Sequence, residues 1–205
     1  SYIPPHQQFP YVLVVFNMFS CYGRFSLQIF LFYVEIGDLG GEVFGFDGQH
    51  LKILLIKRAE NPRDLWSGHI ALPGGRWDDA DKALSETALR ETREEVGIEL
   101  PGDALLGRLP RLSPVNRRLP AIDITPFVAL APPDATVRAN HEVAAHFWAT
   151  VARLRETGPA SVFHLDVPGE RHSFPAYDYD GHIIWGLTER ILTRFLALLD
   201  PVGER

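Results

Sequence analysis

The chain has 205 residues, of which 46% are hydrophobic and 22% are charged, and this composition is typical of one globular domain with a sizeable core. Its formal net charge of −6 argues against a basic surface that binds nucleic acid. The one cysteine, Cys21, excludes an internal disulfide and disfavours a thiolate zinc site, so we expect a reducing, cytoplasmic compartment.

Two apolar runs, residues 11–19 and 25–34, dominate the first fifty residues. Together they approach the length that spans a membrane, but each run alone has the length of a strand. Gly23 and Arg24 lie between them and favour a turn, so the sequence predicts a β-hairpin, with a membrane anchor as the alternative. We expect no secretory signal, because positions 4 and 5 are prolines and a basic segment is lacking.

A glycine-rich turn over residues 37–48 leads into LKILLIKR at 51–58, an apolar run of strand length. A second run, Ile70 to Leu72, ends at Pro73-Gly74-Gly75. The two glycines let the backbone approach a ligand closely, so the Gly75 carbonyl is a candidate ligand for an ion.

A helix is predicted over residues 82–96, ending at Gly97. At about 100° per residue, Glu91 and Glu95 fall among the apolar positions of this helix, and Glu94 lies beside them. Unpaired carboxylates there are costly. Their spacing brings the three acids to one point, which suits Mg²⁺ or Mn²⁺. The alternative is that arginines neutralise the acids, since Arg90 is four residues from Glu94.

Further elements are predicted in the second half of the chain. They are strands over 105–112 and 122–130, a short helix over 151–156, an irregular segment rich in aromatic residues up to position 180, and an amphipathic helix over 183–199.

The residues from Arg90 to Ile98, RETREEVGI, match the second half of the Nudix box, G-x5-E-x7-R-E-U-x-E-E-x-G-U, where U is aliphatic. Thr92 departs from an aliphatic position. One extra residue between Gly75 and Arg90 places Asp81, a shorter acid, where the box has its first glutamate. The chain therefore resembles the Nudix superfamily, which implies a single domain over 1–205, with 1–50 atypical, folded as an α/β/α sandwich with a mixed β-sheet between helices.

The resemblance implies roles for the box residues. Glu91, Glu94, Glu95 and the Gly75 carbonyl would hold Mg²⁺ or Mn²⁺, and Arg90 would keep the glutamates in position. The general base would be Glu94 or Glu142; Glu142 precedes a predicted strand that ends in tryptophan, as in the family. The alternative is that Glu142 is a surface residue without a function.

Arginines suit bidentate contacts with phosphate, and solvated arginines without function are the alternative. The candidates for binding substrate phosphate are Arg58, Arg63, Arg117 and Arg118.

The segment from Gly74 to Asp81 and the following ALRE resemble the GGxxDxxD layout of coenzyme A diphosphatases. The upstream element of that subgroup is matched approximately, with departures at Ile56, Ala59 and Leu72. This resemblance favours hydrolysis of coenzyme A or acyl-coenzyme A to 3′,5′-ADP and (acyl-)phosphopantetheine. Two alternatives stay open: a Nudix enzyme for a nucleotide sugar, ADP-ribose or an oxidised nucleoside triphosphate, and a catalytically silent Nudix protein that binds a ligand.

The expected partner is thus a small nucleotide diphosphate, with self-association as a homodimer left open. Neither nucleic acid nor a membrane is expected as a partner.

Overall fold

The structure is a computed structural model that describes residues 11–20 by their backbone and residues 51–64, 66–113, 122–132, 135–167 and 169–199. Nine strands and three α-helices are assigned within these ranges. None of the helices in these ranges combines the length and the apolarity that crossing a bilayer requires.

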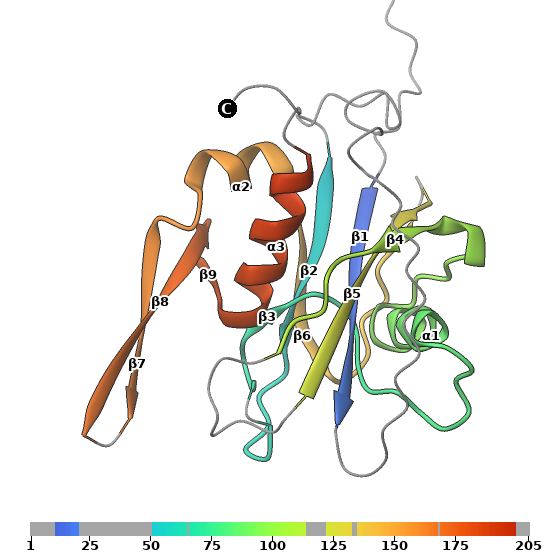
Figure 1. The fold of residues 1–205 in the computed structure, drawn as a ribbon, viewed down its shortest axis with the longest axis horizontal. Helices are drawn as coiled ribbons and strands as arrows, with labels where there is room; N and C mark the ends of the chain where they lie inside the picture. The colour runs from blue at the N-terminus through green and yellow to red at the C-terminus, as the bar shows by residue number, and fades with distance from the viewer. Residues whose placement is uncertain are drawn as a thin grey trace, which may run out of the picture.

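The main sheet has six strands (Figure 1). Five of them follow in the order β3-β2-β1-β5-β4, and the sixth, β6, also pairs with β2. It is mixed, because β1 runs parallel to β2 whereas the other pairs are antiparallel. The strands are β1 (Tyr11–Ser20), β2 (Lys52–Arg58), β3 (Ile70–Ala71), β4 (Leu105–Arg108), β5 (Ile122–Ala131) and β6 (Val143–Thr150).

The first apolar run forms β1, as predicted, and pairs with β5 from Tyr11 to Ser20. Two residues at its start, Tyr11 and Val12, also pair with β2. The second run, 25–34, lies outside the described residues, and so does the predicted hairpin. The predicted strand over 105–112 stops at Arg108, and Leu112 makes only an isolated bridge to Ile124. Pro110 lies in this gap and has no N–H to donate to a neighbouring strand.

A second sheet follows in the order β7-β8-β9, formed by Ser161–Val167, Glu170–Tyr179 and His182–Trp185. The prediction of an irregular segment up to position 180 was therefore wrong. The signal missed in the sequence is the dipeptide Asp180-Gly181, which is typical of a two-residue hairpin turn. In the structure both residues have positive φ, of 51° and 84°. Positive φ at both central residues is the requirement of a type I′ hairpin turn.

The helices are α1 (Leu84–Val96), α2 (Val151–Thr157) and α3 (Gly186–Leu198), with a 3₁₀ turn at Gly102–Ala104. Gly97 ends α1 in the left-handed conformation, as predicted, and its N–H donates to Arg93 O. The helix predicted over 183–199 begins later, at Gly186. The residues before it pair with β8 as the end of β9, so tertiary pairing overrides their helical periodicity.

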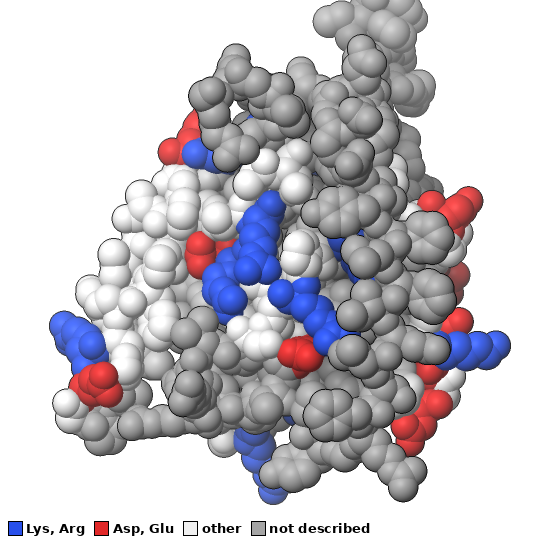
Figure 2. Space-filling view, viewed as in Figure 1, with Lys and Arg blue, Asp and Glu red and all other residues white. Residues whose placement is uncertain are grey.

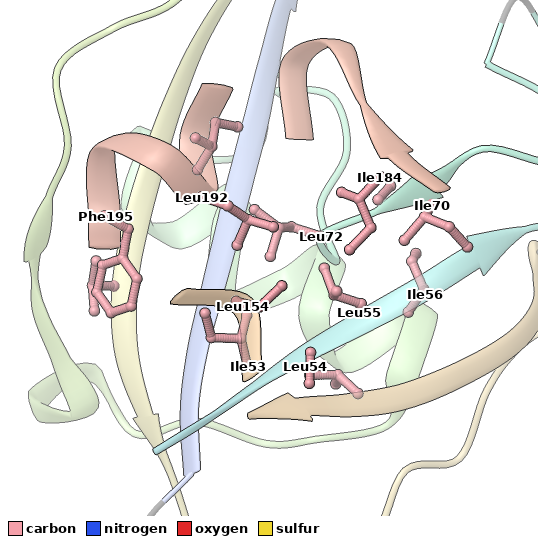
Figure 3. Close-up of a cluster of buried hydrophobic side chains, with 14 of the residues drawn as sticks. Ile53, Leu54, Leu55, Ile56, Ile70, Leu72, Leu154, Ile184, Leu192 and Phe195 are labelled. Atoms are coloured by element: carbon pink, nitrogen blue, oxygen red, sulfur yellow. The ribbon is translucent and has the colours of Figure 1, made fainter. Parts of the chain in front are cut away.

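The core lies on both sides of the main sheet. In β2, the four residues from Ile53 to Ile56 are at most 1% exposed, so both faces of the strand are covered. Helix α1 packs against β1 and β5. Leu192 and Phe195 of α3 contribute to the apolar cluster on the other side (Figure 3). The fold is therefore the expected α/β/α sandwich with a mixed sheet.

Arginines of α3 tie this helix to the segment after β4. Arg190 Nη1 donates to Ser113 O at 2.8 Å, and Arg194 Nη1 donates to Arg111 O at 3.4 Å. Figure 2 shows Lys and Arg side chains across the middle of the face that it draws. Arg111 also pairs with Asp123, at 3.2 Å.

Candidate active site

The bend after β3 lies directly against α1. Gly74 N–H donates to Glu95 Oε2 at 2.8 Å, in a buried position. A Cβ on Gly75 would lie 2.2 Å from Glu91 Cδ, which no real side chain tolerates. With any other residue at this position, the Glu91 carboxylate or the bend would have to shift.

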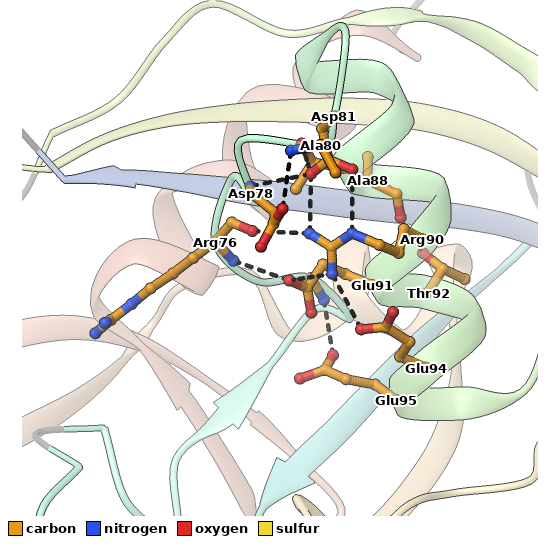
Figure 4. A network of polar contacts seen from close by, with 12 residues as sticks. Arg76, Asp78, Ala80, Asp81, Ala88, Arg90, Glu91, Thr92, Glu94 and Glu95 are labelled. Carbon is orange, nitrogen blue, oxygen red and sulfur yellow. Dashed lines mark hydrogen bonds and ion pairs between the residues drawn. The ribbon is translucent and has the colours of Figure 1, made fainter.

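Arg90 is the centre of the polar network between the bend and α1 (Figure 4). Its Nη1 donates to Glu91 Oε1 and to Glu94 Oε2, each at 3.0 Å. Its Nη2 donates to the main-chain oxygen of Arg76, also at 3.0 Å. One guanidinium group thus connects two box glutamates to the turn that precedes the helix.

The same guanidinium makes two bonds to Asp81, from Nε at 3.1 Å and from Nη2 at 2.9 Å. Asp81 is 9% exposed and also accepts from Thr87 Oγ1 and from the Asp78 N–H. The hydrogen bonds from Arg90 hold the pKa of Asp81 well below its ordinary value, against the effect of burial. Asp81, which replaces the first glutamate of the box, therefore anchors Arg90, even though one extra residue lies between Gly75 and Arg90.

Glu95 is the most enclosed box acid, with 3% of its surface exposed. Burial raises its pKa to about 7, although the Gly74 N–H and the Arg58 guanidinium act in the opposite direction. The negative charges of Glu91 and Glu142 raise it further. Ionised Glu95 thus lacks full compensation, since Arg58 Nη1 is 3.9 Å from Glu95 Oε1.

Arg58 is bound mainly to another acid. Its Nε and Nη2 both donate to Asp64 Oδ2, at 2.9 and 2.8 Å. Two guanidinium groups, Arg58 and Arg90, therefore face five carboxylates: Asp64, Asp81, Glu91, Glu94 and Glu95. The arginines neutralise this cluster only in part, and when all five acids are ionised an excess of negative charge remains.

A divalent cation fits the donors of this cluster in kind. The carboxylates are hard oxygen ligands with uncompensated charge, and the space beside Gly75 is one that a Cβ would fill. Within the described ranges, no three His, Cys, Asp or Glu side chains are gathered closely enough to enclose an ion in this conformation. Glu91 and Glu94 are turned to Arg90, and Glu95 is turned to the Gly74 N–H.

The other predicted site residues are placed as follows. Glu142 is exposed before β6, and its main-chain oxygen accepts from Ala59 N at 2.8 Å, beside the end of β2. Arg63 is exposed in the following turn, where its N–H donates to Asn61 Oδ1. Arg117 and Arg118 lie outside the described residues.

His69 packs its ring against the ring of Trp185. Its ring centroid is 4.9 Å from that of Trp185, and burial lowers its pKa. Both rings line a hollow of about 260 Å³ beside the end of β2, together with Lys57 and Phe163. None of the box acids lines this hollow.

Sequence reasoning missed one contact of the site and the reason why one departure from the box is tolerated. Asp64 holds Arg58, and no spacing rule connects a strand end to an acid in the next turn. The buried Thr92 was noted only as a departure from the box. Its Oγ1 donates to Ala88 O at 2.7 Å, so the hydroxyl is satisfied within the helix and costs little at an apolar position.

Comparison with known proteins gives a consistent assignment. The NUDIX domain model matches residues 42–167, more than half of the chain. NudL of Cronobacter sakazakii, described as an uncharacterized Nudix hydrolase, is 35% identical over 154 residues, which cover 75% of this chain and 76% of that protein. NudL of Photorhabdus laumondii, with the same description, is 38% identical over 144 residues, covering 68% and 73%.

Among solved structures, a MutT/nudix family protein from Enterococcus faecalis aligns with 98% of this chain and 66% of its own, at 17% identity and a TM-score of 0.48. The assignment depends on the family model and on the NudL relatives, which confirm the resemblance inferred from the box. Nudix hydrolases act on diphosphate linkages of small nucleotide substrates and generally use a divalent metal. This chain belongs to the Nudix family and is a Nudix hydrolase.

Proposed function

We propose that this Nudix hydrolase cleaves the diphosphate bond of a nucleoside diphosphate linked to a second group, with coenzyme A or acyl-coenzyme A as the substrate. The products would be 3′,5′-ADP and phosphopantetheine or its acyl form. The proposal rests on the acid cluster on α1. Glu95 is buried and accepts a hydrogen bond from the Gly74 N–H, and Glu91 lies against Gly75. Two arginines neutralise only part of the negative charge of these carboxylates.

Diphosphate linkages react slowly with water because their negative oxygens repel a nucleophile. Mg²⁺ or Mn²⁺ bound by Glu91, Glu94, Glu95 and the Gly75 carbonyl would neutralise this charge and make water more acidic. The water oxygen then forms a bond to phosphorus, while the bond from that phosphorus to the bridging oxygen breaks. The proton of the water passes to a carboxylate base.

Two carboxylates are candidates for this base. Glu94 has a side chain that is 48% exposed and held at one oxygen by Arg90. Glu142 is exposed, and its charge acts on Glu95. Arg90 positions Glu91 and Glu94 by binding both of them. We assign the binding of substrate phosphate to Arg63 and, after its release from Asp64, to Arg58. Arg117 and Arg118 are assigned the same role from the sequence alone.

Support for coenzyme A comes from the GGxxDxxD layout, in which Asp81 anchors Arg90. The names of the two NudL relatives specify no substrate. The alternatives are another nucleotide, such as a nucleotide sugar, ADP-ribose or an oxidised nucleoside triphosphate, and a silent binding protein. The presence of Glu91, Glu94 and Glu95, the three glutamates assigned to the metal, favours an active enzyme over the silent protein.

We also propose that residues 1–205 form one domain that works in the cytoplasm on a small-molecule substrate, and that self-association is as a homodimer. Support for a reducing compartment comes from the single cysteine. Size-exclusion chromatography with light scattering measures the oligomeric state directly.

Incubation of the protein with a panel of diphosphates and Mg²⁺, with products identified by mass, tests the function. We expect cleavage of coenzyme A, and a decrease in kcat of at least roughly 10²-fold in Glu95→Gln and Glu94→Gln, with little change in thermal unfolding. Glu99→Gln is the matched control, because Glu99 is exposed just beyond the helix. Full Mg²⁺-dependent activity of Glu95→Gln would contradict the metal role of the cluster.

The same assay separates the two candidate bases. Loss of kcat in Glu142→Gln with retained Mg²⁺ affinity would assign the base to Glu142, whereas wild-type kcat in that variant would leave Glu94. Ligand affinity without hydrolysis of any diphosphate would favour the silent binding protein.

A further inference from the structure

Arg76 has an unusual position in the turn between Gly75 and α1. Its N–H donates to Glu91 Oε1 at 3.1 Å, and its main-chain oxygen accepts from Arg90 Nη2 at 3.0 Å. Both main-chain polar groups of this residue are therefore bound to box residues. The position of its Cα relative to the acid cluster is fixed without any contribution from its side chain.

The turn that carries Arg76 is held at several further points. Trp77 Nε1 donates to Asp81 O at 3.2 Å, and Asp78 N–H donates to Asp81 Oδ2 at 3.1 Å. Asp81 is in turn bound by Arg90. The main chain that carries Arg76 is thus held in place before a ligand binds, so binding need not order this turn.

The side chain itself is exposed and extends away from Arg90 and Asp81 (Figure 4). Among the described residues it makes no ion pair, whereas Arg58 and Arg90 both bind carboxylates. Of these three arginines beside the bend, Arg76 is the one whose guanidinium pairs with no acid in the described ranges, so its five N–H donors can bind a ligand. A guanidinium fork matches the oxygens of a phosphate monoester.

We propose that Arg76 is a specificity-determining residue that binds a phosphate monoester of the substrate lying outside the scissile diphosphate. The inference rests on the proposed function and narrows its substrate class to nucleotides with an additional phosphate on the ribose. The direction of the side chain supports this assignment, because the scissile diphosphate belongs at the box acids and Arg76 reaches away from them. This additional phosphate neutralises the positive charge of Arg76, which pairs with none of the acids of the cluster.

Paired substrates that differ only in the ribose phosphate test the proposal: coenzyme A against 3′-dephospho-coenzyme A, and NADPH against NADH. In Arg76→Gln we expect KM for the phosphorylated member to rise about tenfold, as for loss of a hydrogen bond to a charged group. We expect kcat to stay within about twofold, and KM for the other member to be unchanged. Arg76→Lys, which keeps the charge and loses the fork, should recover part of the affinity.

Arg93→Gln is the matched control, because Arg93 is exposed on α1 outside the acid cluster. Equal effects of Arg76→Gln on both members of a pair, or an effect on kcat alone, would overturn the proposal. Calorimetric binding of adenosine 3′,5′-bisphosphate against AMP needs no turnover. If the wild-type protein cleaves no diphosphate, the proposed function fails, but the binding measurement still tests Arg76. The assignment is rejected if Arg76→Gln loses the same affinity for both ligands, or loses affinity for neither.

Discussion

Single residues of the bend and of α1 are constrained by their immediate neighbours. Gly75 has no room for a methyl group because the Glu91 carboxylate occupies that space. Thr92 is fully buried, yet its hydroxyl donates to Ala88 O and needs no partner outside the helix. A larger residue at the first position would force the Glu91 side chain or the bend to move, whereas the second position accepts a polar atom where the family has an aliphatic residue.

Gly75→Ala should displace Glu91 and inactivate the enzyme. A Cβ at 2.2 Å from Glu91 Cδ forces the carboxylate or the bend to move, and a shift of about 1 Å at a catalytic group costs roughly 10²-fold in rate. Steady-state kinetics with Mg²⁺ measures the effect. Gly102→Ala is the control, since a Cβ there meets nothing within 4 Å. Equal kcat/KM in the two variants would contradict the required proximity of Gly75 and Glu91.

At the scale of elements, Asp81 connects the turn to α1 through Arg90. The carboxylate accepts bonds from Arg90, Thr87 and the Asp78 N–H, and these interactions favour its ionised form. Its pKa in the folded state is therefore lower than in the unfolded chain, where an aspartate has a pKa of about 3.9. The stabilisation is fully present above that value and is lost as the pH falls through the folded-state pKa.

Asp81→Asn should lower the free energy of unfolding by about 1–3 kcal/mol at pH 7, because charge-assisted hydrogen bonds are lost. The difference from wild type should stay constant down to about pH 5 and shrink below about pH 4. Urea unfolding at a series of pH values measures it. A difference that grows on acidification would mean that Asp81 is not held in its ionised form by Arg90.

At the scale of the whole molecule, the site depends on both outer layers of the sandwich. Helix α1 supplies the acids, whereas α3, on the other side of the sheet, binds β3, because Thr188 Oγ1 donates to Ile70 O at 3.0 Å. Strand β3 leads directly into the glycine bend. The layer that carries no box acid therefore still helps to fix the bend against α1.

Leu192→Ala should destabilise the fold by about 2–5 kcal/mol, since Leu192 is completely buried between α3 and the sheet. Leu198→Ala on the same helix is the control, because Leu198 is 39% exposed, and its effect should be within about 0.5 kcal/mol. Urea unfolding of both variants gives the comparison. Similar losses in the two would show that α3 does not cover the core as described.

Local spacing in the sequence determined the strand at 52–58, the helix with its end at Gly97, the glycine bend and the positions of Glu91, Glu94 and Glu95 within about one turn of that helix, because each depends on residues close to one another in the chain. Tertiary structure alone decided how charge is shared. Arg58 binds Asp64, Arg90 binds three acids, and Arg76 forms no ion pair with the described residues, since these outcomes depend on which groups packing brings together. The same holds for β9, where pairing with β8 is stronger than a helical pattern that ignores neighbours in space.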